Sequence, residues 1–415
     1  MKIKKWILLG IYLFVFFVPI LPQDKYRIEY KNLPISADTL IIMYIVLLLA
    51  IMLLKKENRK EIKKSLNKFI KSYFFMAVIA YTVVCIASLF VAINKKAAVM
   101  ELGRFWTYII LFFVILVFVD NEEDIKRIVK LFIVSILLTC IYGLSQYFMK
   151  STKFLDATIG MGTGRVFSSF VNPNYWGAFI NLVFFPILML AKNKVKNYRF
   201  LYVLLILLFT NSVLSYTRGS WVGMVIGFVL LSILYNIKLL IPVAAIVPLS
   251  FFVPKLWQRI MSIFDLKSLT IGERFILWKT GYMMFKEHPI LGVGNGNYNF
   301  RYRDYVVKYP ELYLDRPLYS VHNSYLKVLA ETGILGIISF IGVIAFYINE
   351  IINVYKNSSN KLAKDMSIAF LCSMASYLFQ NISNNLFFIP QLNAFYWIIG
   401  ALLISYNNIK AVSTN

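Results

Sequence analysis

The chain has 415 residues, of which 59% are hydrophobic and only 15% are charged. Soluble domains are about 45–50% apolar and about 25% charged, so this composition excludes an ordinary soluble domain. The formal net charge of +24 would indicate nucleic acid as a partner of a soluble protein, but in a membrane protein it has another explanation. Three cysteines, Cys85, Cys140 and Cys372, lie inside apolar stretches, which predicts buried thiols rather than a disulfide or a metal site.

Apolar stretches separated by short charged segments follow one another along the chain. A hydrocarbon core about 30 Å thick takes about 20 helical residues to cross. The first stretch ends in Val18-Pro19-Ile20-Leu21-Pro22 without a small-residue cleavage site, so we expect it to remain as an anchor. In total the pattern predicts about twelve transmembrane helices, over residues 4–21, 37–54, 70–93, 105–119, 125–148, 174–191, 200–215, 219–236, 238–253, 333–353, 366–388 and 391–407.

The basic residues check this topology independently, because the cytoplasmic segments of membrane proteins are rich in Lys and Arg. With the N-terminus inside and the helices alternating, the cytoplasmic segments hold 23 Lys and Arg, eight of them in Lys55–Lys71. The short outer loops hold ten, and the long loop after the ninth stretch holds eleven. We therefore expect a multi-pass protein of the cytoplasmic (inner or plasma) membrane with both termini cytoplasmic. Its partner is then the lipid bilayer, with no nucleic acid.

One connection is much longer than the others. Residues 1–253 carry nine predicted helices and residues 333–415 carry three, while residues 254–332 form a polar loop of 79 residues on the outer, periplasmic or extracellular, face. Loops of this length in compact proteins are usually functional. Within the loop, Glu273–Lys286 predicts an amphipathic helix lying along the membrane interface. A second helix is expected to begin near His322 and to run into the tenth span.

Charged residues at membrane depth need a reason, since each costs at least about 2.5–3.5 kcal/mol. Arg218 occupies a very tight turn, Tyr216–Trp221, between two long apolar stretches. Its side chain either extends toward the interface from a helix end or forms an anion site near the outer face. Glu101 and Arg104 flank the fourth span, where we expect a mutual ion pair at the helix end.

The eleventh span contains two amide pairs four residues apart, Gln380 with Asn384 and Asn381 with Asn385. These side chains are expected to point into the bundle rather than toward lipid. There they either form hydrogen bonds between helices or line a polar substrate cavity.

Both histidines of the chain lie in the long loop. His288 precedes Pro289 and is expected to be a turn residue with a structural role. His322 lies near the start of the helix that re-enters the membrane. Glycines alternate in Gly292–Asn297, but the spacing and context differ from a dinucleotide fingerprint. This segment predicts a flexible turn, with a backbone nest for phosphate as the alternative.

Two kinds of motif are absent from the sequence. There is no Asp-x-Asp pair of the kind that holds a metal for nucleotide-sugar transfer, and no Walker-type phosphate loop. We therefore expect no metal and no other cofactor. A reaction on the outer face would need a donor that is already activated.

Several motifs agree, in order and spacing, with one family. The chain resembles the O-antigen ligase and O-antigen polymerase superfamily of polytopic bacterial glycosyltransferases. The segments that carry the resemblance are Phe170–Tyr175 (FVNPNY), Thr217–Trp221 (TRGSW), Arg274–Lys279 (RFILWK), His288–Gly294 (HPILGVG), His322–Leu326 (HNSYL) and Glu331–Gly336 (ETGILG). By motif the resemblance covers roughly residues 165–340, and by topology it covers the whole chain.

The resemblance implies an all-α, GT-C-like membrane enzyme that needs no metal. Members take a glycan from undecaprenyl pyrophosphate and transfer it to a saccharide acceptor on the outer side of the cytoplasmic membrane. The acceptor is a lipid A core sugar in ligases and another lipid-linked glycan in polymerases, and the motifs are compatible with both. In-line displacement of the pyrophosphate would invert the anomeric configuration.

The family's functional residues map onto three positions of this sequence. Arg218 and Arg274 match arginines that would hold the two phosphates of the donor with charge-assisted hydrogen bonds. His322 matches the histidine that would act as general base or orient the acceptor hydroxyl, for which an unperturbed pKa near 6.5 is suitable. Asn323, Trp221 and Tyr325 are the further expected substrate-binding residues. Glu331 and Asp304 are available as a second carboxylate.

Two other classes of protein fit part of the pattern. A flippase for lipid-linked oligosaccharide would also have about a dozen helices and a polar cavity. It has little use for a 79-residue loop that holds both histidines. A non-catalytic assembly protein would tolerate the loss of Arg218 or His322.

Overall fold

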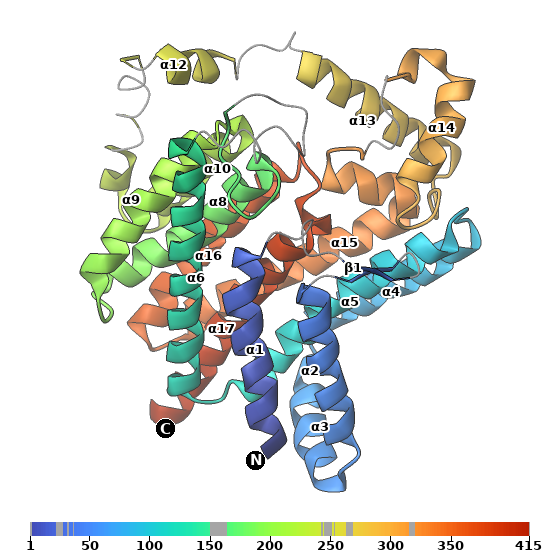
Figure 1. Ribbon diagram of the computed structural model, residues 1–415. Helices are drawn as coiled ribbons and strands as arrows, with labels where there is room; N and C mark the ends of the chain where they lie inside the picture. The colour runs from blue at the N-terminus through green and yellow to red at the C-terminus, as the bar shows by residue number, and fades with distance from the viewer. Residues whose placement is uncertain are drawn as a thin grey trace.

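The computed structural model describes residues 2–21, 28–30, 33–35, 37–149, 164–241, 244, 251–252, 254–262, 269–314 and 320–414. These residues form a bundle of long helices that carries a group of shorter helices at one end (Figure 1). Within this described part of the chain, seven helices are long and apolar enough to cross a membrane, and three shorter ones are also apolar. The chain is therefore a multi-pass membrane protein that is almost entirely helical, as the sequence predicts.

The first half of the chain forms the helices α1 (Lys2–Ile20), α2 (Ala37–Leu53), α3 (Lys56–Ile70), α4 (Tyr73–Ala87), α5 (Lys95–Phe118) and α6 (Glu122–Phe148). A small antiparallel hairpin, β1 (Ile28–Tyr30) and β2 (Leu33–Ile35), separates α1 from α2. The second half forms α8 (Pro173–Lys192), α9 (Tyr198–Leu214), α10 (Arg218–Leu234), α12 (Pro254–Met261), α13 (Leu269–Glu287), α14 (Tyr298–Lys308), α15 (Ser324–Asn357), α16 (Lys361–Gln380) and α17 (Pro390–Thr414). Short 3-10 turns, η1 (Ser88–Phe90), η2 (Ile237–Leu239), η3 (Pro310–Leu312) and η4 (Leu386–Phe388), connect some of them.

Asparagine side chains begin several of these helices. Asn94 accepts a hydrogen bond from the backbone N–H of Ala97, and Asn121 accepts one from that of Asp124. Asn172 does the same for Asn174 at the start of α8, where Pro173 supplies a preset backbone angle. Each cap satisfies an N–H that the helix itself leaves unpaired.

The predicted spans differ from the observed helices at several places, three of which concern polar residues or the long loop, and the count of twelve is not confirmed. The fourth span begins at Lys95, ten residues earlier than the expected 105, so Glu101 and Arg104 lie inside α5 instead of flanking a span. The eleventh ends at Gln380 rather than 388, because the amides that follow bond outside the helix. The ninth, 238–253, lies mostly outside the described residues, although its start is the 3-10 turn η2 rather than an α-helix.

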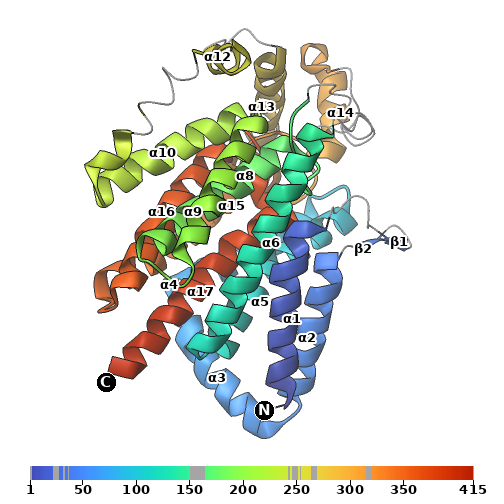
Figure 2. The ribbon, with the colours of Figure 1, turned by 60° about the vertical axis from the view of Figure 1, so that its left-hand side comes forward.

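Both ends of the chain lie at the same end of the bundle, opposite α12, α13 and α14 (Figures 1 and 2). The basic helix α3 lies at the end that holds the N-terminus. This arrangement is the one that the alternating topology requires of a protein with both termini on one side.

The long loop is a folded unit and not an extended connection. Its predicted helix, Glu273–Lys286, lies within α13. α13 packs on the first part of α15 and on α14, around a small core of its own. The three thiols, by contrast, are free and buried within the membrane-spanning helices, as expected. The core of the loop unit is formed by Leu277, Met284, Val293, Tyr298, Tyr302, Tyr305, Val321 and Ala330.

The re-entering helix α15 begins at Ser324, close to the predicted start, and changes direction at Gly333. Gly333 has a φ of 67°, a left-handed conformation that only glycine adopts without cost. A Cβ there would lie 2.3 Å from the carbonyl oxygen of Ile290. The N–H of Ile334 donates to the carbonyl of Pro289, 2.8 Å away, so the His-Pro segment and the Glu-Thr-Gly segment form one junction.

Substitution of this glycine tests the junction. We expect Gly333→Ala to destabilise the protein by about 1–3 kcal/mol or more, through the left-handed backbone and the close carbonyl. Gly342→Ala is the matched control in the same helix, because its Cβ would meet Ala77 at an ordinary 3.6 Å. Thermal unfolding in detergent measures both, and equal melting temperatures for the two variants would contradict the role of Gly333.

Candidate active site

The turn between α9 and α10 forms one side of the candidate site. Tyr216 has a φ of 46°, a conformation that non-glycine residues adopt only when their surroundings impose it. The indole N–H of Trp221 donates to the carbonyl of Ser212 and so fastens α10 back onto α9. Thr217 Oγ1 donates to the carbonyl of Pro173, which joins this turn to the start of α8. Arg218 is the first residue of α10 and lies at the centre of this arrangement.

Arginines from three separate segments gather around that turn. Arg165 donates from Nε to the carbonyl of Ser215, at 2.9 Å, and from Nη2 to Thr217 Oγ1, at 3.0 Å. Arg259 in α12 donates to the carbonyl of Tyr216 at 3.0 Å. Arg218 itself donates to the carbonyl of Ser262, just after α12. Backbone carbonyls therefore hold these guanidinium groups in place and leave their charges uncompensated.

The pKa shifts of the arginines show that a fourth arginine, Arg274 of α13, belongs to the same group. Burial lowers the pKa of Arg165 to about 10, and the positive charges of the three other arginines add to the effect. Burial followed by the charge of Arg218 lowers the pKa of Arg274, and the same two causes lower that of Arg259. We call Arg165, Arg218, Arg259, Arg274 and the nearby His322 the cationic cluster.

No carboxylate among the described residues forms an ion pair with any of the four arginines. Partial burial weakens the screening of like charges, so their repulsion opposes the packing of this region. A bound anion would relieve that repulsion. The cluster therefore has the electrostatic character of an anion site, which was one of the two interpretations of Arg218.

His322 lies directly before α15, in a segment that is fastened on both sides. Ser324 Oγ donates to Asn381 Oδ1 at 2.6 Å, and Asn385 Nδ2 donates to the hydroxyl of Ser320. Asn381 and Asn385 thus hold this segment by hydrogen bonds, the first of the two expected uses, whereas the side chains of Gln380 and Asn384 donate within their own segment. His322 has a φ of 52° and is, after Tyr216, the second left-handed residue in this region.

The pKa of His322 differs from the ordinary value that the sequence suggested. Burial and then the charge of Arg274 lower it from 6.5 to about 4. Its imidazole is therefore neutral at pH 7 and can accept a proton there, but it is a weaker base than expected. The shift also shows that His322 and Arg274 are close enough for their charges to interact.

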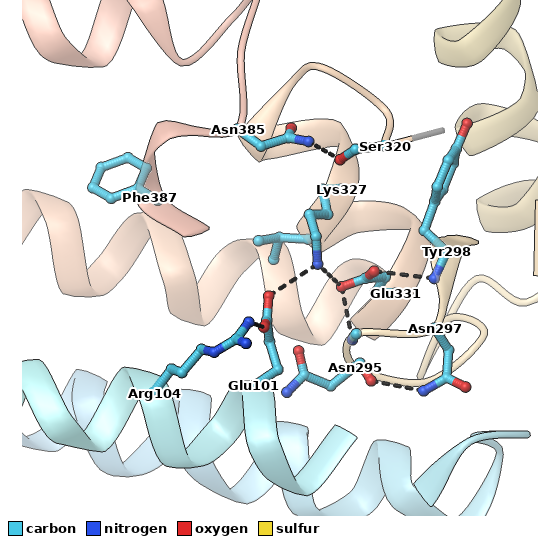
Figure 3. A network of polar contacts seen from close by, with 12 residues as sticks. Glu101, Arg104, Asn295, Asn297, Tyr298, Ser320, Lys327, Glu331, Asn385 and Phe387 are labelled. Atoms are coloured by element: carbon cyan, nitrogen blue, oxygen red, sulfur yellow. Dashed lines mark hydrogen bonds and ion pairs between the residues drawn. The ribbon is translucent and has the colours of Figure 1, made fainter. Parts of the chain in front are cut away.

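The alternating glycines form a backbone nest, but its anion is a side chain of this protein. Glu331 accepts hydrogen bonds from the backbone N–H groups of Gly296 and Tyr298, at 2.9 and 3.0 Å (Figure 3). The N–H of Gly294 donates to the backbone carbonyl of the same glutamate. The segment therefore has no free N–H groups here for a phosphate, and Glu331 is not available as a second catalytic carboxylate. Asp304 is paired with Arg301, and its side chain is exposed on α14.

Lys327 connects this nest to the bundle. Its ammonium group lies 2.5 Å from Glu331 Oε2 and 3.2 Å from Glu101 Oε1 of α5 (Figure 3). Glu101 in turn accepts from Arg104 at 3.2 Å, so the expected ion pair between these two residues is present. Two acidic and two basic side chains neutralise one another, which fixes the loop unit against α5.

The remaining expected site residues have structural partners. Asn323 Oδ1 caps α15 by accepting from the N–H groups of Tyr325 and Leu326. The hydroxyl of Tyr325 donates to the carbonyl of Leu378, and Trp221 is fastened to α9 as described. Their binding roles stay predictions. His288 is an exposed residue at the end of α13, in line with its expected place in a turn.

The sequence motifs do not predict two members of the cluster. Arg165 precedes the Phe170–Tyr175 motif and Arg259 follows the ninth stretch, and neither belongs to a motif. Their residue type is the signal that could have identified them. Both are arginines in segments assigned to the loop-bearing side, where basic residues are otherwise disfavoured.

Comparison with known proteins agrees with this geometry. Residues 203–341 match the Wzy_C family, described as O-Antigen ligase. The match covers 139 of the 415 residues, and in this segment the chain is similar to the O-antigen ligase family. The segment contains Arg218, Arg259, Arg274 and His322, whereas Arg165 lies before it. The family resemblance in the motifs is thereby confirmed.

Two relatives share longer stretches of sequence with the chain. One is an uncharacterized protein of Haemophilus influenzae, 26% identical over 315 residues, which are 69% of this chain and 75% of the relative. The other is the teichuronic acid biosynthesis protein TuaE of Bacillus subtilis, 22% identical over 345 residues. That match covers 76% of this chain and 66%, just under two thirds, of the relative. Family and fold together indicate a membrane protein of glycosyl transfer in cell-surface polysaccharide synthesis.

The ionisation of His322 tests its place in the cluster. The imidazole is expected to stay neutral well below pH 6.5, since its pKa is lowered to about 4. Pyrophosphate bound at the arginines should offset the charge of Arg274 and raise that pKa, so that protons are taken up on binding. NMR of 15N-labelled histidine follows both effects, and His288→Gln assigns the signals because the chain has two histidines. An ordinary pKa, or one that pyrophosphate leaves unchanged, contradicts the arrangement.

Proposed function

We propose that the protein transfers a glycan from undecaprenyl pyrophosphate to an acceptor glycan or lipid-linked saccharide at the outer face of the cytoplasmic membrane. The end of the bundle that carries α12, α13 and α14 is then the outer end, and both termini are cytoplasmic. The observation that carries the proposal is the cationic cluster, in which four partly buried arginines meet beside a neutral histidine. A lipid diphosphate is an anion that reaches such a site from the bilayer.

The cluster suits the charge that develops in this reaction. An acceptor hydroxyl attacks the anomeric carbon of the donor, and the bond from that carbon to the diphosphate oxygen breaks. The departing pyrophosphate keeps the bonding electrons and gains a negative charge. Arg218 and Arg274 hold its oxygens by charge-assisted hydrogen bonds, and this stabilisation grows as the bond breaks.

His322 receives the proton of the acceptor hydroxyl. Its neutral state at pH 7 follows from the lowered pKa, and the bound diphosphate raises its basicity by offsetting the charge of Arg274. Arg165 and Arg259 act indirectly, because both hold the turn that carries Arg218. Attack from the side opposite the leaving group inverts the anomeric configuration.

Related alternatives are separated by experiment. A flippase is not favoured, because the matched family is described as a ligase and the cluster joins groups suited to bond breaking. Ligase and polymerase differ only in the acceptor. In a deletion strain, loss of long glycan chains indicates a polymerase, and lipid-linked polymer that accumulates without attachment indicates a ligase. The name of TuaE favours an acid-containing surface polysaccharide as product.

Purified variants in vesicles with lipid-linked donor and acceptor test the proposed roles. Removal of one stabilising donor in Arg218→Ala or Arg274→Ala should lower glycan transfer about 10²–10³-fold, the usual loss for such a group. His322→Ala should lower kcat far more than it raises KM for the donor.

Arg301→Ala is the matched control, because Arg301 also lies in the loop unit but pairs with Asp304 outside the cluster. Full transfer by a correctly inserted Arg218→Ala or Arg274→Ala protein shows that the arginines do not hold the diphosphate. Movement of the donor across vesicles without glycan joining identifies a transporter instead.

A further inference from the structure

A second candidate binding site lies between α4, α5, α15, α17 and η4. It is a crevice that shares no lining residue with the cationic cluster. Its walls are mostly aromatic and aliphatic, and its few polar groups lie together. Pockets of this composition commonly bind small molecules that are partly apolar.

The polar groups of the crevice lie toward the loop-bearing end of the bundle. α5 begins beside the loop unit, where Asn297 Oδ1 accepts from the N–H of Asn94. Glu101 and Arg104 follow within the first turns of α5, and Asn393 lies in the first turn of α17. A lipid of the near leaflet would place its headgroup region at this level.

The apolar groups lie deeper along the same helices. Phe105 and Tyr108 come next on α5, and Val343 and Ile344 lie in the middle of α15. The crevice therefore changes from polar to apolar along its length. This order matches that of a lipid, in which the hydrocarbon chain follows the headgroup.

Arg104 is the side chain in this crevice that is best placed to bind a ligand. Its side chain is 43% exposed although it lies within a helix able to span a membrane. It donates to Glu101, which also accepts from Lys327 and is therefore already shared (Figure 3). A guanidinium group has five N–H donors, and a charge facing a bilayer is costly unless an anion or water meets it. Phosphate in a lipid headgroup is the abundant anion at this depth.

Two buried polar atoms border the same crevice. Asn393 and Trp397 lie one turn apart on α17 and are 4% and 2% exposed. Asn393 Oδ1 and Trp397 Nε1 have no hydrogen-bond partner among the described residues. Asn393 lies toward the polar end, where a lipid hydroxyl can donate to its free oxygen, whereas the ring of Trp397 lies 4.4 Å from that of Tyr347 and so borders the apolar end.

We propose that this crevice binds one anionic membrane phospholipid, with its phosphate on Arg104 and one hydrocarbon chain along Phe105, Val343 and Ile344. The occupant is a phospholipid rather than a free phosphate because the walls beyond Arg104 are apolar. The site is separate from the proposed transfer reaction and does not depend on it. Since Glu101 joins Arg104 to Lys327, the bound lipid also steadies the contact between α5 and the loop unit.

Quenching of tryptophan by brominated lipid tests the site. Full-length protein in detergent micelles is titrated with phosphatidylglycerol that carries a brominated chain, and with brominated phosphatidylcholine. We expect a saturable quenching component at low mole fraction with phosphatidylglycerol only, because Trp397 lies against the bound chain. Trp397→Phe should remove that component and so identify its origin.

Two variants and a matched control separate the parts of the site. Arg104→Gln should raise the half-saturating lipid fraction about tenfold, as expected for loss of one charge-assisted hydrogen bond. Val343→Phe should abolish saturable binding by filling the apolar end while Arg104 stays in place. Arg301→Gln removes another arginine paired with a carboxylate three residues away, outside the crevice, and should change nothing.

Several results overturn the proposal. Equal quenching by both lipids, or an unchanged half-saturation in a folded Arg104→Gln protein, shows that no anionic lipid binds there. Displacement by inorganic phosphate assigns the site to phosphate alone. Displacement by a polyprenyl phosphate at a far lower mole fraction than phosphatidylglycerol assigns it to that carrier lipid.

Discussion

Mutual repulsion among four guanidinium groups is the constraint around which one end of this protein is arranged. Arg165, Arg218 and Arg259 are held by the carbonyls of Ser215, Ser262 and Tyr216. These carbonyl groups fix the orientation of the guanidinium groups but do not neutralise their charge. The packing of neighbouring helices must therefore offset the repulsion between the arginines. Positive backbone angles at Tyr216 and His322 are a further cost in the same place. Such costs persist at functional sites, which supports the proposal that an anion binds here.

In the loop unit, by contrast, buried charges are neutralised by other side chains of the protein. Glu331 is buried, yet two backbone N–H groups and Lys327 satisfy its carboxylate, and Glu101 with Arg104 completes a neutral network. This network holds the helix that follows His322, while the amides after α16 hold the segment that contains it. The charges of this network balance one another within the protein, although Arg104 keeps N–H donors for the proposed lipid, whereas the charges of the cationic cluster are left for the proposed anion. The contrast explains why removing Lys327 or Glu331 should affect stability and removing a cluster arginine should affect substrate handling.

The sequence alone predicts most of the long apolar helices and three of the five cluster residues, for identifiable reasons. Hydrophobic length predicts spans well, and the motifs carry Arg218, Arg274 and His322. It misplaced the start of the fourth span because charged residues look like a boundary, although Glu101 is neutralised by Lys327, which is 226 residues away. It predicts a flexible turn at the glycine segment, with a phosphate nest as the alternative, because the anion inside the observed nest comes from Glu331, on another helix. Arg165 and Arg259 could not be found by motif, since only the folded chain brings them to the turn of Arg218.

A cryo-EM structure of the full chain with undecaprenyl pyrophosphate bound tests the anion site most directly. Both phosphate groups should lie within hydrogen-bonding distance of Arg218 and Arg274, with the imidazole of His322 on the side where the sugar would be attached. The isoprenoid chain should leave the cluster toward the bilayer. Diphosphate density away from the turn at Tyr216–Trp221, with the four arginines still unoccupied, would contradict the proposed use of their charge.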